Sequence, residues 1–151
     1  MSRDAAPRRT AAWVCADCGR SIYLQIERPA DGLGCPGCGR WQPLRIDAEA
    51  LGSRTVSRCL QCGRDQLYTQ KDFNRKLGLA VFIVAALLSV PTWGVSLLAA
   101  TLIDFGLYYL IGSVTICYAC NTQHRGFQPN PAHGPFDLHI AEAVDRLSRA
   151  V

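Results

Sequence analysis

With 151 residues, 16 Lys and Arg, and 12 Asp and Glu, the chain has the length of one ordinary domain and a formal net charge of +4. The distribution of charge argues against a single domain. Residues 1–76 hold 13 of the basic side chains, residues 77–116 hold none, and residues 117–151 hold three. Two small polar parts therefore flank an apolar middle, and parts this small need metal or disulfides to fold.

Residues 1–12 carry Arg3, Arg8 and Arg9 among small residues, which predicts a disordered basic tail. No apolar run follows these arginines, so the sequence predicts no signal peptide.

Residues 13–46 contain the first two Cys-x-x-Cys pairs, Cys15/Cys18 and Cys35/Cys38, separated by 16 residues. Two thiolates three residues apart on a tight turn supply half of a tetrahedral metal site. Between the pairs, Ile22 to Ile26 alternates apolar and polar residues and predicts a strand. This pattern predicts a first zinc ribbon, followed by a linker over residues 47–56.

The other two pairs, Cys59/Cys62 and Cys117/Cys120, are separated by 54 mostly apolar residues. We expect residues 57–72 and 114–130 to form a second zinc ribbon with a helical hairpin inserted between its halves. His124 lies four residues after Cys120 and is expected to be a surface group or a neighbour of the ligands. His133 and His139 have no ligand-like spacing and are expected to face solvent.

Metal and disulfides compete for paired cysteines. Gly follows the pair at Gly19, Gly39 and Gly63, which suits metal knuckles because glycine lets the chain turn and leaves backbone N–H groups pointing at sulfur. Asn121 takes this place after the fourth pair, and asparagine tolerates the left-handed conformation. Without a predicted signal peptide, reduced thiols and metal are favoured.

Residues 73–113 predict a two-helix hairpin that turns at residues 91–94. A membrane span needs about 20 apolar residues, so the sequence predicts two transmembrane helices in contact with lipid. Basic residues before the first helix and Arg125 after the second place both chain ends in the cytoplasm, in a bacterial inner membrane. A buried helical hairpin is the alternative.

Asp104 is the single acidic residue of the apolar run. Thr101 and Tyr108 share its helix face. An acidic group within a membrane is costly, so Asp104 is a candidate intramembrane polar contact, either to a partner helix in a homo-oligomer or within the hairpin to Ser89 or Thr101. A proton or ion site is the alternative.

Residues 131–151 form a C-terminal segment in which Ile140, Val144, Leu147 and Val151 recur at helical spacing. They predict a short amphipathic helix that packs on a ribbon, a membrane surface or a partner.

Trp13, Gly19, Cys35, Pro36, Cys38 and Gly39 give residues 13–44 a resemblance to zinc ribbons and to the rubredoxin-type module of rubrerythrins. The whole arrangement resembles small bacterial membrane proteins with two zinc ribbons. The expected fold class is therefore small metal-bound β ribbons plus α-helices: two zinc ribbons, an inserted transmembrane hairpin and a short C-terminal helix. The resemblance implies four-sulfur ligation and no particular activity.

We expect two zinc ions, with iron as the alternative, because both metals accept four thiolates in a tetrahedron. No catalytic set is recognisable, and eight ligating cysteines leave no open metal position, so a non-enzymatic protein is expected. Its predicted role is a membrane-anchored module that binds a protein partner or assembles a membrane complex. A rubredoxin-like electron carrier and a membrane-tethered nucleic-acid binder are alternatives, although dispersed basic residues argue against nucleic acid.

Overall fold

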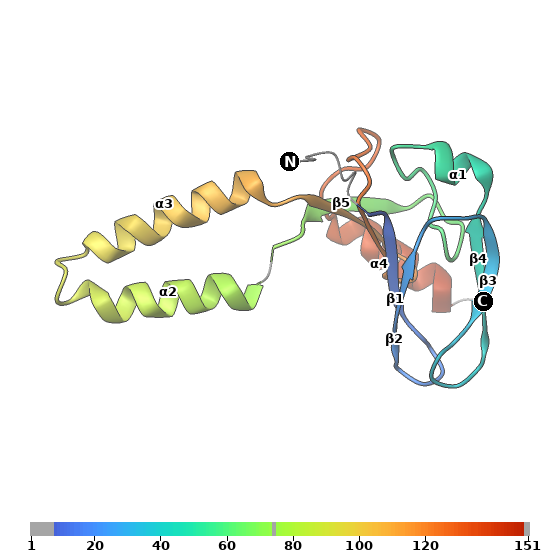
Figure 1. Ribbon diagram of the computed structural model, residues 1–151, viewed down its shortest axis with the longest axis horizontal. Coiled ribbons are helices and arrows are strands. Elements are labelled where there is room, and N and C mark those ends of the chain that lie inside the picture. The colour runs from blue at the N-terminus through green and yellow to red at the C-terminus, as the bar shows by residue number, and fades with distance from the viewer. Residues whose placement is uncertain (1–7, 74, 150–151) are drawn as a thin grey trace, which may run out of the picture. The chain divides into compact units, whose positions relative to one another are not determined.

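The structure is a computed structural model that describes residues 8–73 and 75–149, drawn in Figure 1. The strands are β1 (Thr10–Val14), β2 (Ser21–Gln25), β3 (Ala30–Gly34), β4 (Trp41–Ile46), β5 (Leu67–Lys71), β6 (Ser113–Cys117) and β7 (Gln123–Arg125). The helices are α1 (Ala48–Gly52), α2 (Arg75–Ser89), α3 (Val95–Leu110) and α4 (Leu138–Arg149). The first seven residues of the expected basic tail lie outside the described residues, whereas Thr10 to Ala12 begin β1.

The chain divides into two compact units. The first, which we call the base, contains the chain up to Gln70 and from Ser113 onward, and the second is the hairpin from Lys71 to Gly112. The hairpin is thus an insertion in the base, between β5 and β6. The fold is small and β-rich, with few helices.

One five-stranded sheet joins the two halves of the base, in the order β2-β1-β7-β6-β5. Within it, β1 pairs antiparallel with β2, where Trp13 faces Ile22, and with β7, where Ala11 faces His124. A separate two-stranded sheet contains β3 and β4. The two ribbon-like modules that the sequence indicates therefore share a sheet, because a strand of the first lies beside a strand of the second.

The hydrophobic core of the base also spans both modules. It combines side chains of β1, β2 and β4 with side chains that precede or follow the later cysteines, namely Trp13, Ile22, Leu44, Ile46, Val56, Leu60, Leu67 and Phe127. The first cysteine of every pair is buried in this core: Cys15, Cys35, Cys59 and Cys117. The buried cysteines therefore add to a hydrophobic core that would be small if it contained only hydrocarbon side chains.

The four Cys-x-x-Cys pairs adopt the same backbone turn. In each, the amide of the first cysteine donates to the carbonyl five residues later, at 2.8 to 3.1 Å. The residue after the second cysteine donates to the carbonyl of the first, at 2.9 to 3.0 Å. That residue has positive φ in every pair: Gly19 (70°), Gly39 (73°), Gly63 (76°) and Asn121 (55°). The sequence therefore places glycine, or asparagine, where the left-handed backbone requires it.

The expected transmembrane hairpin is wrong. No helix within the described residues is both long enough and apolar enough to cross a membrane. The 15 residues of α2 and 16 of α3 span about 22 and 24 Å, whereas the hydrocarbon core of a bilayer is about 30 Å thick. The apolar run is not wholly helical: residues 90–94 form the turn between the helices, and the last residues of the run belong to β6.

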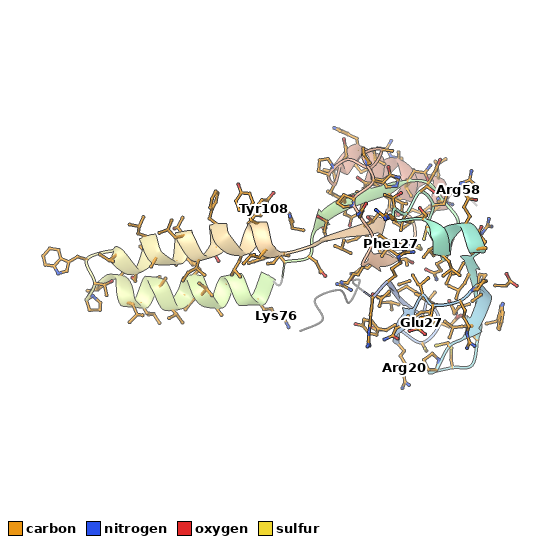
Figure 2. All side chains as sticks on the ribbon, turned by 45° about the horizontal axis from the view of Figure 1, so that its top comes forward. Arg20, Glu27, Arg58, Lys76, Tyr108 and Phe127 are labelled. Atoms are coloured by element: carbon orange, nitrogen blue, oxygen red, sulfur yellow. The ribbon has the colours of Figure 1, made fainter. Side chains whose placement is uncertain are left out.

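This finding also corrects the conclusions drawn from a membrane span. The inner-membrane location with both chain ends in the cytoplasm is overturned, and Asp104 is no longer an intramembrane group. The helical hairpin itself is present: α2 and α3 pack on each other, and Figure 2 shows side chains projecting along both of them.

The left-handed turns give the first prediction. Gly39→Ala should lower the free energy of unfolding of the metal-loaded protein by about 1–2 kcal/mol, because φ is 73° there and a Cβ would meet no other atom within 4 Å. Urea unfolding measures the change. Gly134→Ala is the matched control, since its Cβ also has open space and its φ is not positive. Equal effects of the two substitutions would contradict the conformational explanation.

Candidate metal centres

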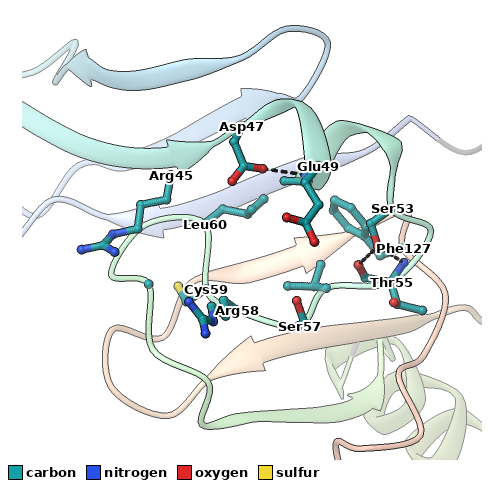
Figure 3. A pocket seen from close by; sticks show the side chains of 13 residues that line it. Arg45, Asp47, Glu49, Ser53, Thr55, Ser57, Arg58, Cys59, Leu60 and Phe127 are labelled. Atoms are coloured by element: carbon teal, nitrogen blue, oxygen red, sulfur yellow. Dashed lines mark hydrogen bonds between the residues drawn. The ribbon is translucent and has the colours of Figure 1, made fainter.

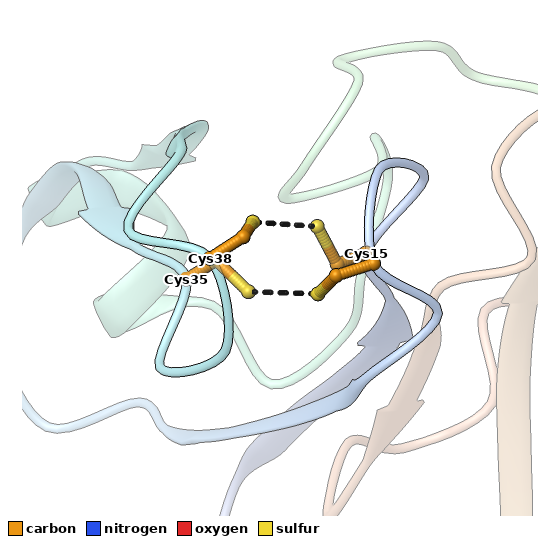
Figure 4. Close-up of side chains that lie close together, drawn as sticks. Cys15, Cys35 and Cys38 are labelled. Carbon is orange, nitrogen blue, oxygen red and sulfur yellow. Dashed lines mark hydrogen bonds between the residues drawn. The ribbon is translucent and has the colours of Figure 1, made fainter.

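The first cluster forms where two hairpins of the base end. Cys15 and Cys18 follow β1, and Cys35 and Cys38 follow β3. Their sulfur atoms all lie within 4.8 Å of one another. The Cys15 and Cys38 Sγ atoms are 3.9 Å apart, and those of Cys18 and Cys35 are 3.6 Å apart, as the dashed lines in Figure 4 mark. Four sulfurs from two hairpins thus face a common centre.

The second cluster joins cysteines from both sides of the inserted hairpin. Cys59 and Cys62 precede β5, whereas Cys117 ends β6 and Cys120 lies in the turn before β7. The Sγ atoms of Cys59 and Cys120 are 3.4 Å apart, and those of Cys62 and Cys117 are 3.6 Å apart. The structure therefore brings the eight cysteines together in the two groups that the sequence indicates.

The sulfur geometry fits a tetrahedral metal ion. A Zn–S bond of about 2.3 Å gives a sulfur–sulfur edge of roughly 3.8 Å in a regular tetrahedron. The observed separations of 3.4 to 3.9 Å bracket that edge, and all eight thiols are unbridged. Each cluster could hold one metal ion, and four sulfurs suit zinc and iron alike.

Local hydrogen bonds favour a thiolate in each cluster. Backbone N–H groups of Cys38 and Gly37 lower the pKa of the Cys35 thiol to about 6, and the Gly37 nitrogen lies 3.4 Å from that sulfur. In the second cluster, hydrogen bonds with the thiols of Cys117 and Cys59 lower the pKa of Cys120. Metal binding requires deprotonated cysteine, so each cluster contains one sulfur already biased toward the ligating form.

Arginine is a feature of the knuckles that sequence reasoning missed. Arg20, Arg40 and Arg64 each follow the glycine of a knuckle. The Arg20 side chain lies against Gly37, and Arg40 pairs with Asp17 at 3.0 Å. Four thiolates with one divalent ion carry a charge of −2, so nearby guanidinium groups favour the loaded cluster. The repeated Cys-Gly-Arg triplet was the signal that could have revealed this.

The two clusters differ in their exposure. Cys18 and Cys38 of the first cluster are exposed, whereas Cys62 and Cys120 of the second are half-buried. Around the second cluster, the Thr122 hydroxyl lies 3.0 Å from the Cys120 sulfur and 2.6 Å from the Gln61 side-chain oxygen, to which it donates. The second cluster is thus more completely enclosed by the protein.

Of the two roles expected for His124, the surface role is wrong, because the residue is 1% exposed and lies on β7, in the middle of the sheet. It is instead a neighbour of the cysteine ligands. Its Nε2 accepts a hydrogen bond from the Leu60 backbone amide at 3.2 Å, and its Nδ1 lies 3.2 Å from the Thr115 carbonyl. Since Nε2 is the acceptor, Nδ1 carries the proton. The imidazole thus links the Cys59/Cys62 turn to the sheet by a hydrogen bond. It is not a member of either cysteine cluster.

The other candidate residues occupy ordinary positions. His139 is exposed, as expected. The expectation that His133 faces solvent is wrong: this side chain is half-buried, with its Nε2 2.9 Å from the Val56 carbonyl. Asp104 is half-buried in α3, and its Oδ1 has no hydrogen-bond partner among the described residues. The expected bonds to Ser89 or Thr101 do not form, because those hydroxyls donate to helix carbonyls.

A groove of about 570 Å³ lies beside the second cluster, between α1 and the Cys59 turn. Figure 3 shows Arg45 and Arg58 near Cys59, with Glu49 facing the same space from α1. These three side chains are exposed. The groove therefore presents both signs of charge to solvent rather than an enclosed catalytic pocket.

Comparison with family models, with curated proteins and with solved structures finds no match for this chain. The assignment of the clusters as candidate metal sites consequently depends on their sulfur geometry.

The buried imidazole gives the second prediction. Burial lowers the pKa of His124 to about 4 from its ordinary 6.5, so folding favours the neutral ring. The stability that this provides is complete above pH 6.5 and is lost as pH falls from 6.5 toward 4. At pH 5 the loss should be roughly 2 kcal/mol.

Urea unfolding at pH 7.5 and pH 5 measures this loss. His124→Gln is the control, because its amide oxygen can still accept from the Leu60 amide but does not titrate in this range. Acid weakening of the thiolate clusters affects both proteins and cancels in the comparison. An equal loss of stability in both proteins would refute the prediction.

Proposed function

We propose that this chain is a non-enzymatic, metal-stabilised assembly module whose hairpin associates with a second copy. Two tetra-cysteine clusters hold the base together, and the inserted hairpin provides the contact surface. The observation that carries the proposal is the exposure of large apolar side chains on both helices of the hairpin. The four-sulfur clusters support a structural role for the metal, because they leave no open ligand position.

The exposed apolar side chains of the hairpin are spread over both of its helices and its turn. They occur on α2, on the turn and on α3, and include Phe82, Leu87, Val90, Trp93, Leu98, Leu102, Phe105 and Leu110, all between 59% and 96% exposed. Contiguous apolar patches beyond a few hundred Å² usually mark a contact surface. Helices that are apolar all round are normally covered by other elements.

A groove between the two helices suggests how a second copy would pack. Its volume is about 410 Å³, and small residues line much of it: Ala80, Ala85, Ser96, Ala99 and Ala100. Larger side chains flank it at Val84, Leu88 and Ile103. Small residues between larger ones let a facing helix approach closely, so two hairpins can pack groove to ridge as a four-helix bundle.

Zinc is the metal that suits this role best, since closed four-sulfur sites usually hold structural zinc. A second candidate function, rubredoxin-like electron transfer with iron, is favoured by one observation: Cys18 and Cys38 are exposed. A ligand at the surface would let an electron reach an iron ion from a docked partner.

Metal analysis separates these functions and is the third prediction. The purified chain should be colourless and contain two zinc ions, as measured by elemental analysis and native mass spectrometry. Two double variants, Cys59→Ser/Cys62→Ser and Cys15→Ser/Cys18→Ser, should each retain one zinc ion per chain. A red protein whose visible absorbance disappears on reduction would instead establish the iron carrier, and a metal-free chain would contradict both functions.

Self-association of the hairpin is the fourth prediction. The zinc-loaded chain should be a dimer or larger at micromolar concentration by light scattering. Leu98→Lys should weaken this association by about tenfold or more, because a charge would be buried in an apolar interface.

Leu147→Lys is the matched control. Leu98 and Leu147 are both 64% exposed on a helix, but Leu147 belongs to the base. A chain that stays monomeric, or that sediments with phospholipid vesicles without self-association, would contradict the proposal. Equal weakening by both variants would also contradict it.

A further inference from the structure

Tyr118 lies inside a knuckle of the second cluster, between Cys117 and Cys120, and connects that cluster to the C-terminal segment. Its ring lies 4.6 Å from the ring of Tyr68 on β5 and 5.6 Å from that of Phe136, measured between centroids. Tyr68 and Phe136 are themselves 5.2 Å apart. Three aromatic rings therefore join the knuckle, the neighbouring strand and the residues just before α4.

The hydroxyl of Tyr118 also contacts the start of α4. It accepts a hydrogen bond of 2.7 Å from the backbone amide of Asp137. Asp137 in turn begins the helix: its carboxylate accepts from the His139 amide at 2.8 Å and its carbonyl from the Ala141 amide at 3.1 Å. A residue of the metal knuckle is thus bonded to the residue that caps α4.

The rest of α4 lines a groove together with the segment that leaves the other knuckle of the same cluster. Arg64, Asp65 and Gln66, which follow Cys62 and Gly63, line one groove together with Ile140, Val144 and Leu147 of α4. Val144 is 6% exposed there. The carbonyl of Gln66 also accepts the Tyr118 amide at 3.1 Å. The attachment of α4 through Tyr118 and one wall of this groove therefore both come from knuckles of the second cluster.

By itself α4 is a weak helix. It has 12 residues, and isolated helices of that length are marginal in water. Its two internal ion pairs, Glu142–Arg146 at 3.2 Å and Asp145–Arg149 at 2.7 Å, are solvent-exposed and contribute little. Docking against the rest of the base therefore decides whether α4 stays ordered.

We infer that α4 is a metal-gated helix: it is docked while the second cluster holds an ion and is released when the ion leaves. Without the ion, the sulfur–metal bonds between the two knuckles are lost, and the hydrogen bonds from Thr122 to Gln61 and from the Tyr118 amide to the Gln66 carbonyl remain. Tyr118 and residues 64–66 are then held more weakly in their positions. Release uncovers Val144, which is buried in the docked helix, beside the exposed side chains of Ile140 and Leu147. This inference goes beyond the proposed function, which concerns the hairpin, and requires only that the second cluster binds metal.

Hydrogen–deuterium exchange of the zinc-loaded full chain, read over residues 138–149, tests the gate and is the fifth prediction. Tyr118→Phe should raise exchange about fivefold by removing one hydrogen bond, and Tyr118→Ala roughly tenfold or more by also removing the ring. Tyr23→Ala is the control, because Tyr23 is 76% exposed on β2. It should leave the exchange of α4 unchanged.

A second pair of variants distinguishes the two clusters. Cys62→Ser should release α4, whereas Cys18→Ser should leave it protected. If Cys62→Ser also raises exchange in β1 and β2, the base has unfolded and this variant is uninformative. The exchange of α4 in Tyr118→Ala at full zinc occupancy is then the deciding measurement. Unchanged protection of α4 in Tyr118→Ala would overturn the inference. Release by Cys18→Ser with β1 and β2 still protected would overturn it as well.

Discussion

The convergence of four sulfur atoms in the second cluster is the constraint on which the rest of the structure depends. Its two knuckles are 54 residues apart in the sequence, yet their sulfur atoms lie 3.4 to 3.6 Å from their partners. The meeting of these knuckles accompanies the pairing of β7 with β1 on one side and with β6 on the other, which completes the five-stranded sheet. It also fixes the points at which the chain leaves the base for the hairpin and returns. A metal ion here would hold together segments that hydrocarbon packing alone is too small to secure.

The histidine at the middle of the sheet ties this cluster to the first half of the base. His124 faces Ala11 of β1 and Thr115 of β6, and it accepts from the amide next to Cys59. A side chain that is neutral and buried must have both ring nitrogens paired, which fixes its tautomer and orientation. The two clusters therefore belong to one folded domain and not to two independent zinc-ribbon domains.

The sequence predicted the local chemistry well and the long-range pairing poorly. The spacing of the cysteines and the glycines after them indicated four similar turns, because that chemistry is confined to six consecutive residues. Pairing of β1 with β7 could not be foreseen, since nothing in the residues around Ala11 specifies a partner more than a hundred positions away. The apolar run was overinterpreted because Val114 and Ile116, buried in a strand, are as apolar as residues of a helix.

The hairpin is inserted in a loop whose two ends meet at the second cysteine cluster, and this has a consequence for how such chains can diversify. The entropy cost of closing a loop grows only logarithmically with its length, so lengthening or replacing the segment between Lys71 and Gly112 would burden the fold very little. Selection could therefore exchange one excursion for another while the clusters and their sheet stayed intact. The insertion supplies none of the clustered cysteines, so its length and sequence can change, provided that the cysteine pairs on either side of it can still meet.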